Sequence, residues 1–181
     1  MQMNYSELNE LLYHGSNVSF SIIDLSKSTQ KKDFGHGFYT TTDKKQAEKF
    51  ASLKTRRANA NNGYVEIFKI SNFAGLNIKK FYSADEEWFD FVLRNRGYAK
   101  YAANSFNDMF DIVIGPVAND AVGLVLNQFA AGVYGDPSSA ESKAIAIRLL
   151  LTQKLYNQVF FGSEKAVSRL VFLEVYDVCT K

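Results

Sequence analysis

Several residue types are scarce in this chain of 181 residues, and each scarcity excludes a class of protein. A single cysteine, Cys179, cannot form an internal disulfide or a thiol-rich metal site. With only two histidines, His14 and His36, a His/Cys zinc site is not expected either, so we expect no metal. Two prolines argue against long linkers. No apolar run approaches the ~18 residues that span a bilayer, so no membrane partner is expected.

Common functional motifs are also missing. There is no GxGxxG after a strand and no GxxxxGK[ST], which leaves Rossmann and P-loop nucleotide binding unsupported. Neither GxSxG nor HExxH occurs. The formal charge of +2 is too small to indicate nucleic-acid binding by itself. The first ten residues, MQMNYSELNE, lack a basic segment followed by an apolar run, which favours a cytoplasmic location.

Hydrophobic residues make up 46% of the chain and aromatic residues 14%, which is enough for a sizeable core. We expect one domain over residues 1–181, with 72–109 as a candidate helical insertion. About six strands and four or five helices follow one another without a strict βαβα order, which predicts an α+β fold. Strands are expected near residues 11–15, 64–70, 110–118, 157–163 and 170–178, and FGHGFYTTT at 34–42 is expected to be a turn that leads into a strand. A long loop is expected over 17–36.

Helix boundaries are indicated by capping residues. Asp43, with Gln46 three residues later, predicts a capping box at the start of one helix. Ser83 is the expected cap of a second helix that stops at Gly97 and buries a stripe of Trp88, Phe91 and Val92. The segment DPSSAESKAIAIRLLLTQ is expected to be a third helix with Pro137 in its first turn. SEKAVSRL is expected to form a short fourth helix.

Two glycine-flanked motifs carry the candidate chemistry, LYHGS at 12–16 and FGHGFYTTTD at 34–43. A flat ligand can approach the backbone of Gly15, whose N–H and C=O match the acceptor and donor of a carboxamide. His14 can donate to or accept from a ribose hydroxyl, and Ser16 adds a second polar group. Tyr39 offers a ring face for stacking. Taken singly, His14 and Tyr39 are more often structural residues.

Two further positions complete the candidate site. Phe50, eleven residues after Tyr39, can supply a second aromatic face from the following helix. Gln158 opens the apolar strand within LYNQVFF at 155–161. The basic residues between Lys27 and Arg57 form either a positive rim or a solvated helix face, and the second is the commoner case.

The order of these motifs resembles the ADP-ribosyltransferases of the diphtheria-toxin and poly(ADP-ribose)-polymerase type, which carry His, Tyr and Glu on three strands. LYHGS matches the His-Gly-[Ser/Thr] motif, GHGFYTT the Gly-x-Tyr motif, and NQVFF the place of Asn-Glu-Tyr. The chain looks closer still to a bacterial family of uncharacterised domains in the same clan, over residues 11–176. This resemblance implies two small, mostly antiparallel sheets that form a cleft and are flanked by helices.

The resemblance also implies roles. NAD would be the substrate, with His14 on the ribose of its adenosine half, the backbone of Gly15 on the nicotinamide carboxamide, and Ser16 as a further NAD-binding residue. Tyr39 and Phe50 would enclose the nicotinamide ring. Relatives that contact the carboxamide through a serine on this helix would place it near Ala47, so that contact is missing here. His36 is expected to shape a loop.

The third motif departs from the family pattern, because Gln158 stands where the catalytic glutamate is expected. Its amide can hold a ribose hydroxyl but cannot carry charge or act as a base. Either the chain transfers ADP-ribose without that carboxylate, or it borrows one, with Glu164 the nearest candidate, or it binds NAD without turnover. With His14 and Tyr39, Gln158 is the expected catalytic set.

The expected function is transfer of a single ADP-ribose from NAD to a protein or nucleic-acid acceptor. The resemblance adds a bacterial toxin or conflict-system effector as the expected role, with a cognate antitoxin as a candidate partner. The alternatives are an NAD- or ADP-ribose-binding module with little catalysis, and an NAD glycohydrolase. An RNA 2′-phosphotransferase, which needs several basic residues around a phosphate, is a more distant one.

Overall fold

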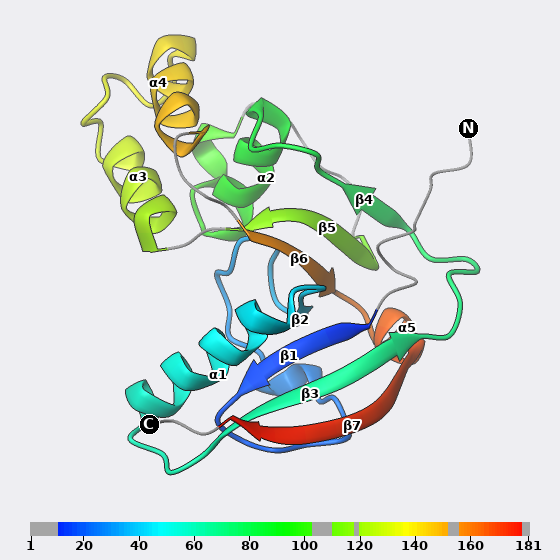
Figure 1. Cartoon of the computed structure of the whole chain (residues 1–181). Coiled ribbons are helices and arrows are strands. Elements are labelled where there is room, and N and C mark those ends of the chain that lie inside the picture. The colour runs from blue at the N-terminus through cyan, green and yellow to red at the C-terminus, as the bar shows by residue number, and fades with distance from the viewer. Residues whose placement is uncertain (1–10, 103–109, 118–119, 152–155, 179–181) are drawn as a thin grey trace.

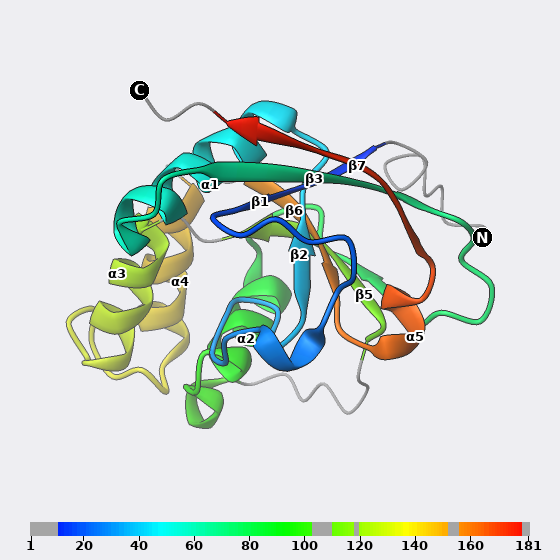
Figure 2. The ribbon, with the colours of Figure 1, turned by 90° about the horizontal axis from the view of Figure 1, so that it is seen from below.

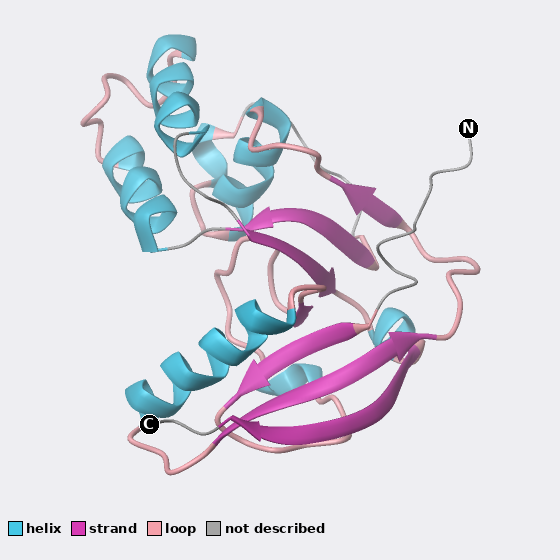
Figure 3. Ribbon diagram, in the orientation of Figure 1, coloured by secondary structure: helices cyan, strands magenta, loops and turns pink. Residues whose placement is uncertain are grey.

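The computed structural model describes residues 11–102, 110–117, 120–151 and 156–178 (Figure 1). These residues form two open sheets and five α-helices, as the α+β prediction requires (Figure 3). Cys179, residues 103–109 of the candidate insertion, and the first residue of LYNQVFF lie outside the described ranges.

The first sheet is antiparallel and has the strand order β1-β3-β7. It consists of β1 (Leu12–Ser16), β3 (Gly63–Ile70) and β7 (Leu170–Val178). β3 lies in the middle, so that His14 of β1 pairs with Glu66 of β3. Residues that face each other across an antiparallel pair lie on the same side of the sheet.

The second sheet has the order β2-β6-β5-β4. It contains β2 (Phe38–Thr40), β4 (Ile78–Lys80), β5 (Ile112–Val117) and β6 (Tyr156–Phe161). Only the β4–β5 pair is parallel, so the sheet is mostly antiparallel, as expected. β4 is a strand that the sequence analysis did not predict, and it lies within the segment 72–109 together with α2 (Glu86–Asn95).

A single bridge between Tyr13 and Thr41 connects the two sheets in the described part of the chain. The Tyr13 N–H donates to the Thr41 carbonyl at 2.8 Å, and the Thr41 N–H donates to the Tyr13 carbonyl at 2.9 Å. The residues after this bridge lead directly into α1 (Lys44–Ala58), which lies along β1 and β3 (Figures 1 and 2).

The cap of α1 is confirmed in part. The Asp43 carboxylate accepts hydrogen bonds from the N–H groups of Lys45 and Gln46, as predicted. The capping box is wrong, because the Gln46 side chain accepts a hydrogen bond from the Thr41 hydroxyl at 2.6 Å instead. That same hydroxyl oxygen accepts from the Asp43 N–H, so Thr41 takes the place that the box reserves for Gln46.

Two other predicted helix starts are corrected. Asp85, and not Ser83, caps α2 through the Trp88 N–H, and the Ser83 hydroxyl donates to Asp85. Pro137 lies in a turn before α4 (Ala140–Leu151), where the Asp136 carboxylate accepts from Ser138. At α2 the capping aspartate lies two residues nearer the helix than Ser83, and at α4 the Ser139 hydroxyl accepts from the Ser142 N–H at 3.1 Å. Gly97, with φ of +92°, follows α2 as predicted.

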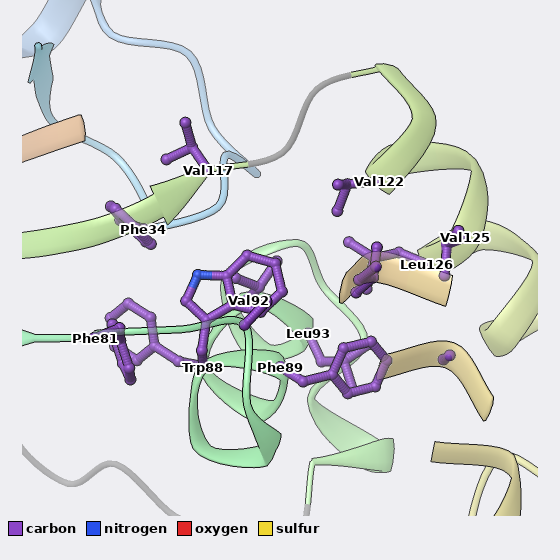
Figure 4. Close-up of a cluster of buried hydrophobic side chains, with 14 of the residues drawn as sticks. Phe34, Phe81, Trp88, Phe89, Val92, Leu93, Val117, Val122, Val125 and Leu126 are labelled. Carbon is purple, nitrogen blue, oxygen red and sulfur yellow. The ribbon is translucent and has the colours of Figure 1, made fainter. Parts of the chain in front are cut away.

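The largest core cluster lies between the second sheet and the helices α2, α3 (Asp120–Ala130) and α4 (Figure 4). Trp88, Phe91 and Val92 are buried in it as predicted. The Trp88 indole N–H donates to the Pro116 carbonyl at 2.7 Å, which fixes α2 against β5. α3 was not predicted.

A second cluster, which includes Leu12, Phe38, Phe68 and Phe161, joins the two sheets, and the short helix α5 (Glu164–Val167) packs on it through Ala166.

Candidate functional site

A cleft of about 540 Å³ opens between the two sheets beside α1. Five of the six predicted site residues line it: His14, Gly15, Tyr39, Phe50 and Gln158. They come from β1, β2, α1 and β6, so that segments 144 positions apart in the chain meet at one place (158 − 14). The volume is in the range of ordinary small-molecule sites.

Gly15 allows α1 to approach β1 closely. A β-carbon at this position would lie 2.1 Å from the Ala47 carbonyl oxygen and 2.8 Å from the Ala51 nitrogen. Both contacts are with backbone atoms of α1, which cannot move aside without displacing the helix. Gly15 is therefore required by packing, independently of any ligand, and this close approach places Phe50 and Lys54 of α1 at the cleft.

His14 is held by a hydrogen bond and by ring contacts. Its Nδ1 lies 2.6 Å from the Tyr39 carbonyl oxygen, so Nδ1 carries the proton and Nε2 is left as an acceptor. The ring stacks on Phe38 at 4.7 Å between centroids and meets the edge of Phe20 at 5.6 Å. Burial, with the positive charge of Lys54 next in importance, lowers the pKa of His14 to about 3. The imidazole is therefore neutral at physiological pH.

Lys54 reaches from α1 to the end of β1. Its Nζ donates to the Gly15 carbonyl at 2.8 Å and lies 3.4 Å from Nε2 of His14. Burial and the nearby Lys32 lower the pKa of Lys54 to about 8, while Glu66 acts in the opposite direction. The Gly15 carbonyl, which was expected to accept a hydrogen bond from a carboxamide of the ligand, thus already accepts one from the Lys54 ammonium group.

The Tyr39 side chain is held by hydrogen bonds at its hydroxyl and by contacts of its ring. Its hydroxyl donates to the Gly35 carbonyl at 2.7 Å and accepts from the Phe34 N–H at 3.1 Å. Burial is the main cause that raises the pKa of this hydroxyl. The Lys32 ammonium lies over the ring, 4.7 Å from its centroid, and Phe160 lies 4.9 Å from it. Phe160 belongs to the core, whereas Lys32 and Tyr39 both line the cleft.

Phe50 and Gln158 complete the cleft from opposite sides. Phe50 is 44% exposed, although it follows the buried Ala47 on the same helix, so its ring is available to a ligand. Gln158 lies on β6 in register with Gly115 of β5 and two residues before Phe160, the partner of Tyr39. Gln158 and Tyr39 consequently project on the same side of the second sheet.

Three other residues named from the sequence lie elsewhere. The Ser16 hydroxyl accepts from the Val18 N–H at 3.2 Å, and Ser16 lines a neighbouring apolar cavity of about 450 Å³. The two cavities share His14 and Lys54 in their walls. His36 lines a third cavity beside α2, in keeping with a role in shaping its loop. Glu164 is exposed at the start of α5 and does not line the cleft, and Ser163 caps that helix.

Charged residues that sequence reasoning did not assign to the site also line the cleft. Lys27, Lys32, Lys54 and Arg96 are basic, and Asp33 is the one carboxylate among the described lining residues. Asp33 is buried and forms an ion pair with Nε of Arg96 at 2.5 Å. The positive-rim interpretation is thus supported for Lys27, Lys32 and Lys54. The helical spacing of Ala47, Phe50 and Lys54 was a signal in the sequence that could have placed Lys54 there.

Glu66, which lies behind the cleft wall, was not predicted from the sequence either. It is fully buried on β3, and neither carboxylate oxygen has a hydrogen bond. Burial raises the pKa of Glu66 to about 7, and the opposing effects come from the backbone N–H groups of Glu66 and Phe20, which lie near the carboxyl without meeting the geometry of a hydrogen bond, and from Lys54. Its position opposite His14 could have been found only from the pairing of β1 with β3, which no local pattern reveals.

The profile of one protein family, described as "Protein of unknown function (DUF3990)", matches residues 11–172. This chain belongs to that family. The match covers every residue that lines the cleft. No curated protein and no solved structure matches the chain.

Two further observations bear on ligands. The described residues contain no group of three or more His, Cys, Asp or Glu side chains arranged to hold a metal ion. Within the same residues, no helix has the length and apolar character needed to cross a membrane.

Proposed function

We propose that this member of the DUF3990 family transfers a single ADP-ribose from NAD to a protein or nucleic-acid acceptor. The observation that carries the proposal is the meeting of His14, Gly15, Tyr39, Phe50 and Gln158 in one cleft. These are the positions at which the sequence resembles ADP-ribosyltransferases of the His-Tyr-Glu type. The four basic side chains in the wall add a second support, since NAD carries a pyrophosphate.

In this reaction the bond between C1′ of the ribose and the nicotinamide nitrogen breaks, and an acceptor atom bonds to C1′. Positive charge develops on the sugar, as in other glycosyl transfers. Tyr39 and Phe50 would enclose the nicotinamide ring, and neutral His14 would bind a ribose hydroxyl through Nε2. Each of these groups acts by orienting NAD, a contribution that needs no metal.

The cleft also favours a second candidate, a binding module with little catalysis. Gln158 cannot supply the negative charge of a glutamate, and the one carboxylate among the described lining residues, Asp33, is paired with Arg96. Loss of one stabilising group typically costs ~10²–10³ in rate. We therefore expect slow turnover, and polymer formation is the least expected activity. Water as the acceptor would make the protein an NAD glycohydrolase.

The test is incubation of the purified protein with NAD labelled in its adenylate phosphate, together with a bacterial lysate. Protein and nucleic-acid fractions are read separately, beside an assay of free nicotinamide. A His14→Gln variant is the control, because glutamine can still donate to the Tyr39 carbonyl. Label that is lost in this variant supports the transferase. Nicotinamide release without label identifies a glycohydrolase, and NAD binding without release identifies the binding module.

A toxin role remains part of the proposal and has its own test. Induced expression of the wild-type protein in bacteria should arrest growth, whereas expression of His14→Gln should not. A neighbouring gene product that restores growth would be the cognate antitoxin. Equal growth with both proteins would count against the toxin role without affecting the proposed chemistry.

A further inference from the structure

Glu66 is an unusual residue for the centre of a sheet. Among the described residues it is the one carboxyl group that is fully buried with both oxygens lacking a hydrogen bond. The buried Asp90 differs, because Lys143 donates to it at 2.7 Å. An ionised carboxyl in such a place costs several kcal/mol of stability. A leucine or valine would fit the core of a sheet better, so the presence of a carboxyl group here points to a function.

The surroundings of Glu66 connect it to the cleft. Glu66 faces His14 across β1 and β3, and Nε2 of His14 lies 3.4 Å from the Lys54 ammonium. The residue opposite Glu66 on β7 is Val175, which carries no charge. Glu66 and Lys54 also attract each other electrostatically, so the buried carboxyl acts on a cation in the cleft wall.

The charges around Lys54 are unbalanced. Neutral His14 faces it from β1, and Lys32 faces it from the loop before β2. Lys27 lines the same cleft. In the described part of the chain, Glu66 is the one negatively charged group that acts on Lys54. The ammonium has three donors, and two described contacts engage it, Gly15 and His14.

We propose that Lys54 binds a phosphate group of the ligand, and that Glu66 is the positioning residue that keeps Lys54 charged and in place beside His14. This inference rests on the proposed function for the identity of the ligand, because the phosphate would belong to the pyrophosphate of NAD. Glu66 itself does not line the cleft and acts only through its neighbours.

The pKa values of Lys54 and Glu66 set the pH range in which replacement of Glu66 should weaken ligand binding. Burial lowers the pKa of Lys54 to about 8, and burial raises that of Glu66 to about 7. Below pH 7 Glu66 is protonated, so its replacement by glutamine leaves the charge of Lys54 unchanged. Near pH 8 Glu66 is ionised and favours the ammonium form of Lys54. Loss of Glu66 therefore lowers the pKa of Lys54 and reduces the charged fraction of Lys54 at pH 8.

The experiment is calorimetric titration with ADP-ribose, which has the pyrophosphate but no nicotinamide to lose, at pH 6 and pH 8. The variants are Glu66→Gln, Glu66→Leu and Lys54→Met. Their matched controls are Glu174→Gln on the exposed side of β7 and Lys45→Met on α1, neither of which lines the cleft. Thermal unfolding of each variant is measured in the same buffers.

The expected results separate a positioning role from a structural one. Both Glu66 variants should bind ADP-ribose like wild type at pH 6 and more weakly, by about twofold or more, at pH 8, where the ionised carboxyl favours the ammonium form of Lys54. Glu66→Leu should also unfold at a higher temperature at pH 8, because an apolar side chain replaces an unpartnered buried carboxylate. Lys54→Met should weaken binding about tenfold or more at pH 6. The controls should match wild type.

Other outcomes overturn the proposal. A lower unfolding temperature of the Glu66 variants with unchanged affinity at pH 8 would make Glu66 a core residue only. Unchanged affinity of Lys54→Met would remove Lys54 as the phosphate ligand. Inorganic pyrophosphate distinguishes this proposal from the proposed function. If it binds wild type and not Lys54→Met, the phosphate site stands even when NAD is not cleaved.

Discussion

The Nδ1 atom of His14 donates a hydrogen bond to the backbone carbonyl of Tyr39, at 2.6 Å, and so joins the first and second motifs directly. The histidine that was expected to bind a ribose is also a structural link between β1 and β2. Replacement by alanine removes both roles at once. A variant that keeps a donor at this point is needed to measure ligand binding alone.

The acid sensitivity of the fold should depend on His14. Its pKa of about 3 lies below the unfolded value of 6.5, so the unfolded chain binds the extra proton between these values and stability falls as the pH drops through this range. The loss between pH 7 and pH 5 is about 2 kcal/mol. Glu66, whose pKa is raised, acts in the opposite direction, so wild type shows only the sum. Chemical denaturation of wild type and His14→Gln should give a difference that changes by about this amount.

Gly15→Ala should destabilise the protein strongly, because its β-carbon would overlap the Ala47 carbonyl oxygen of α1. We expect a loss of about 3 kcal/mol or more in the free energy of unfolding. The matched control is Gly123→Ala within α3, where a β-carbon has its nearest neighbour at 3.6 Å. That change should stabilise by about 0.5–1 kcal/mol. Urea denaturation measures both, and equal behaviour of the two variants would contradict the packing explanation.

Phe50→Ala should weaken NAD binding while leaving the fold intact. The side chain is 44% exposed, so little buried area is lost. An aromatic contact is worth ~0.5–1.5 kcal/mol, which corresponds to a loss of affinity of about two- to tenfold. Tyr82, which is 81% exposed and does not line the cleft, provides the control Tyr82→Ala. If titration with NAD gives the same affinity for both variants, Phe50 does not contact the ligand.

Gln158→Glu should increase the rate of nicotinamide release at least tenfold, since one charge-stabilising group is worth ~10²–10³ in rate. The variant restores the carboxylate at the position that the family pattern assigns to it. Glu164→Gln is the control and should leave the rate unchanged, because Glu164 lies outside the cleft. An unchanged rate in Gln158→Glu would mean that Gln158 is not at the reacting end of NAD.

The sequence was sufficient to predict those helices, strands and motifs whose own residues show a clear pattern. Asp43 marks the start of α1, the alternation in YVEIFKI marks β3, and the two glycine motifs indicate where the cleft lies. β4 has only three residues, and its pairing with β5 depends on tertiary contacts. α3 contains Gly123 and two valines, and its exposed Leu124 weakens the polar face that identifies a surface helix.

The electrostatics of the site were less accessible from the sequence. Lys54 and Glu66 come together only because Gly15 lets α1 pack closely on β1 and because β3 pairs with β1 in one particular register. Nor does a pattern of residues show that Lys32 covers the ring of Tyr39. Such relationships depend on the positions of the charged groups at the ends of long side chains. The hydrophobic periodicity of the sequence does not determine those positions.

The bridge between Tyr13 and Thr41 has a consequence for how wide the cleft can open. In the described part of the chain it is the one place where the backbones of the two sheets exchange hydrogen bonds. Both residues line the cleft, so the connection lies in its wall. Any change in the angle between the sheets must pivot close to these two residues. The deuterium exchange rates of their amide hydrogens would therefore report directly on whether the cleft closes around a bound ligand.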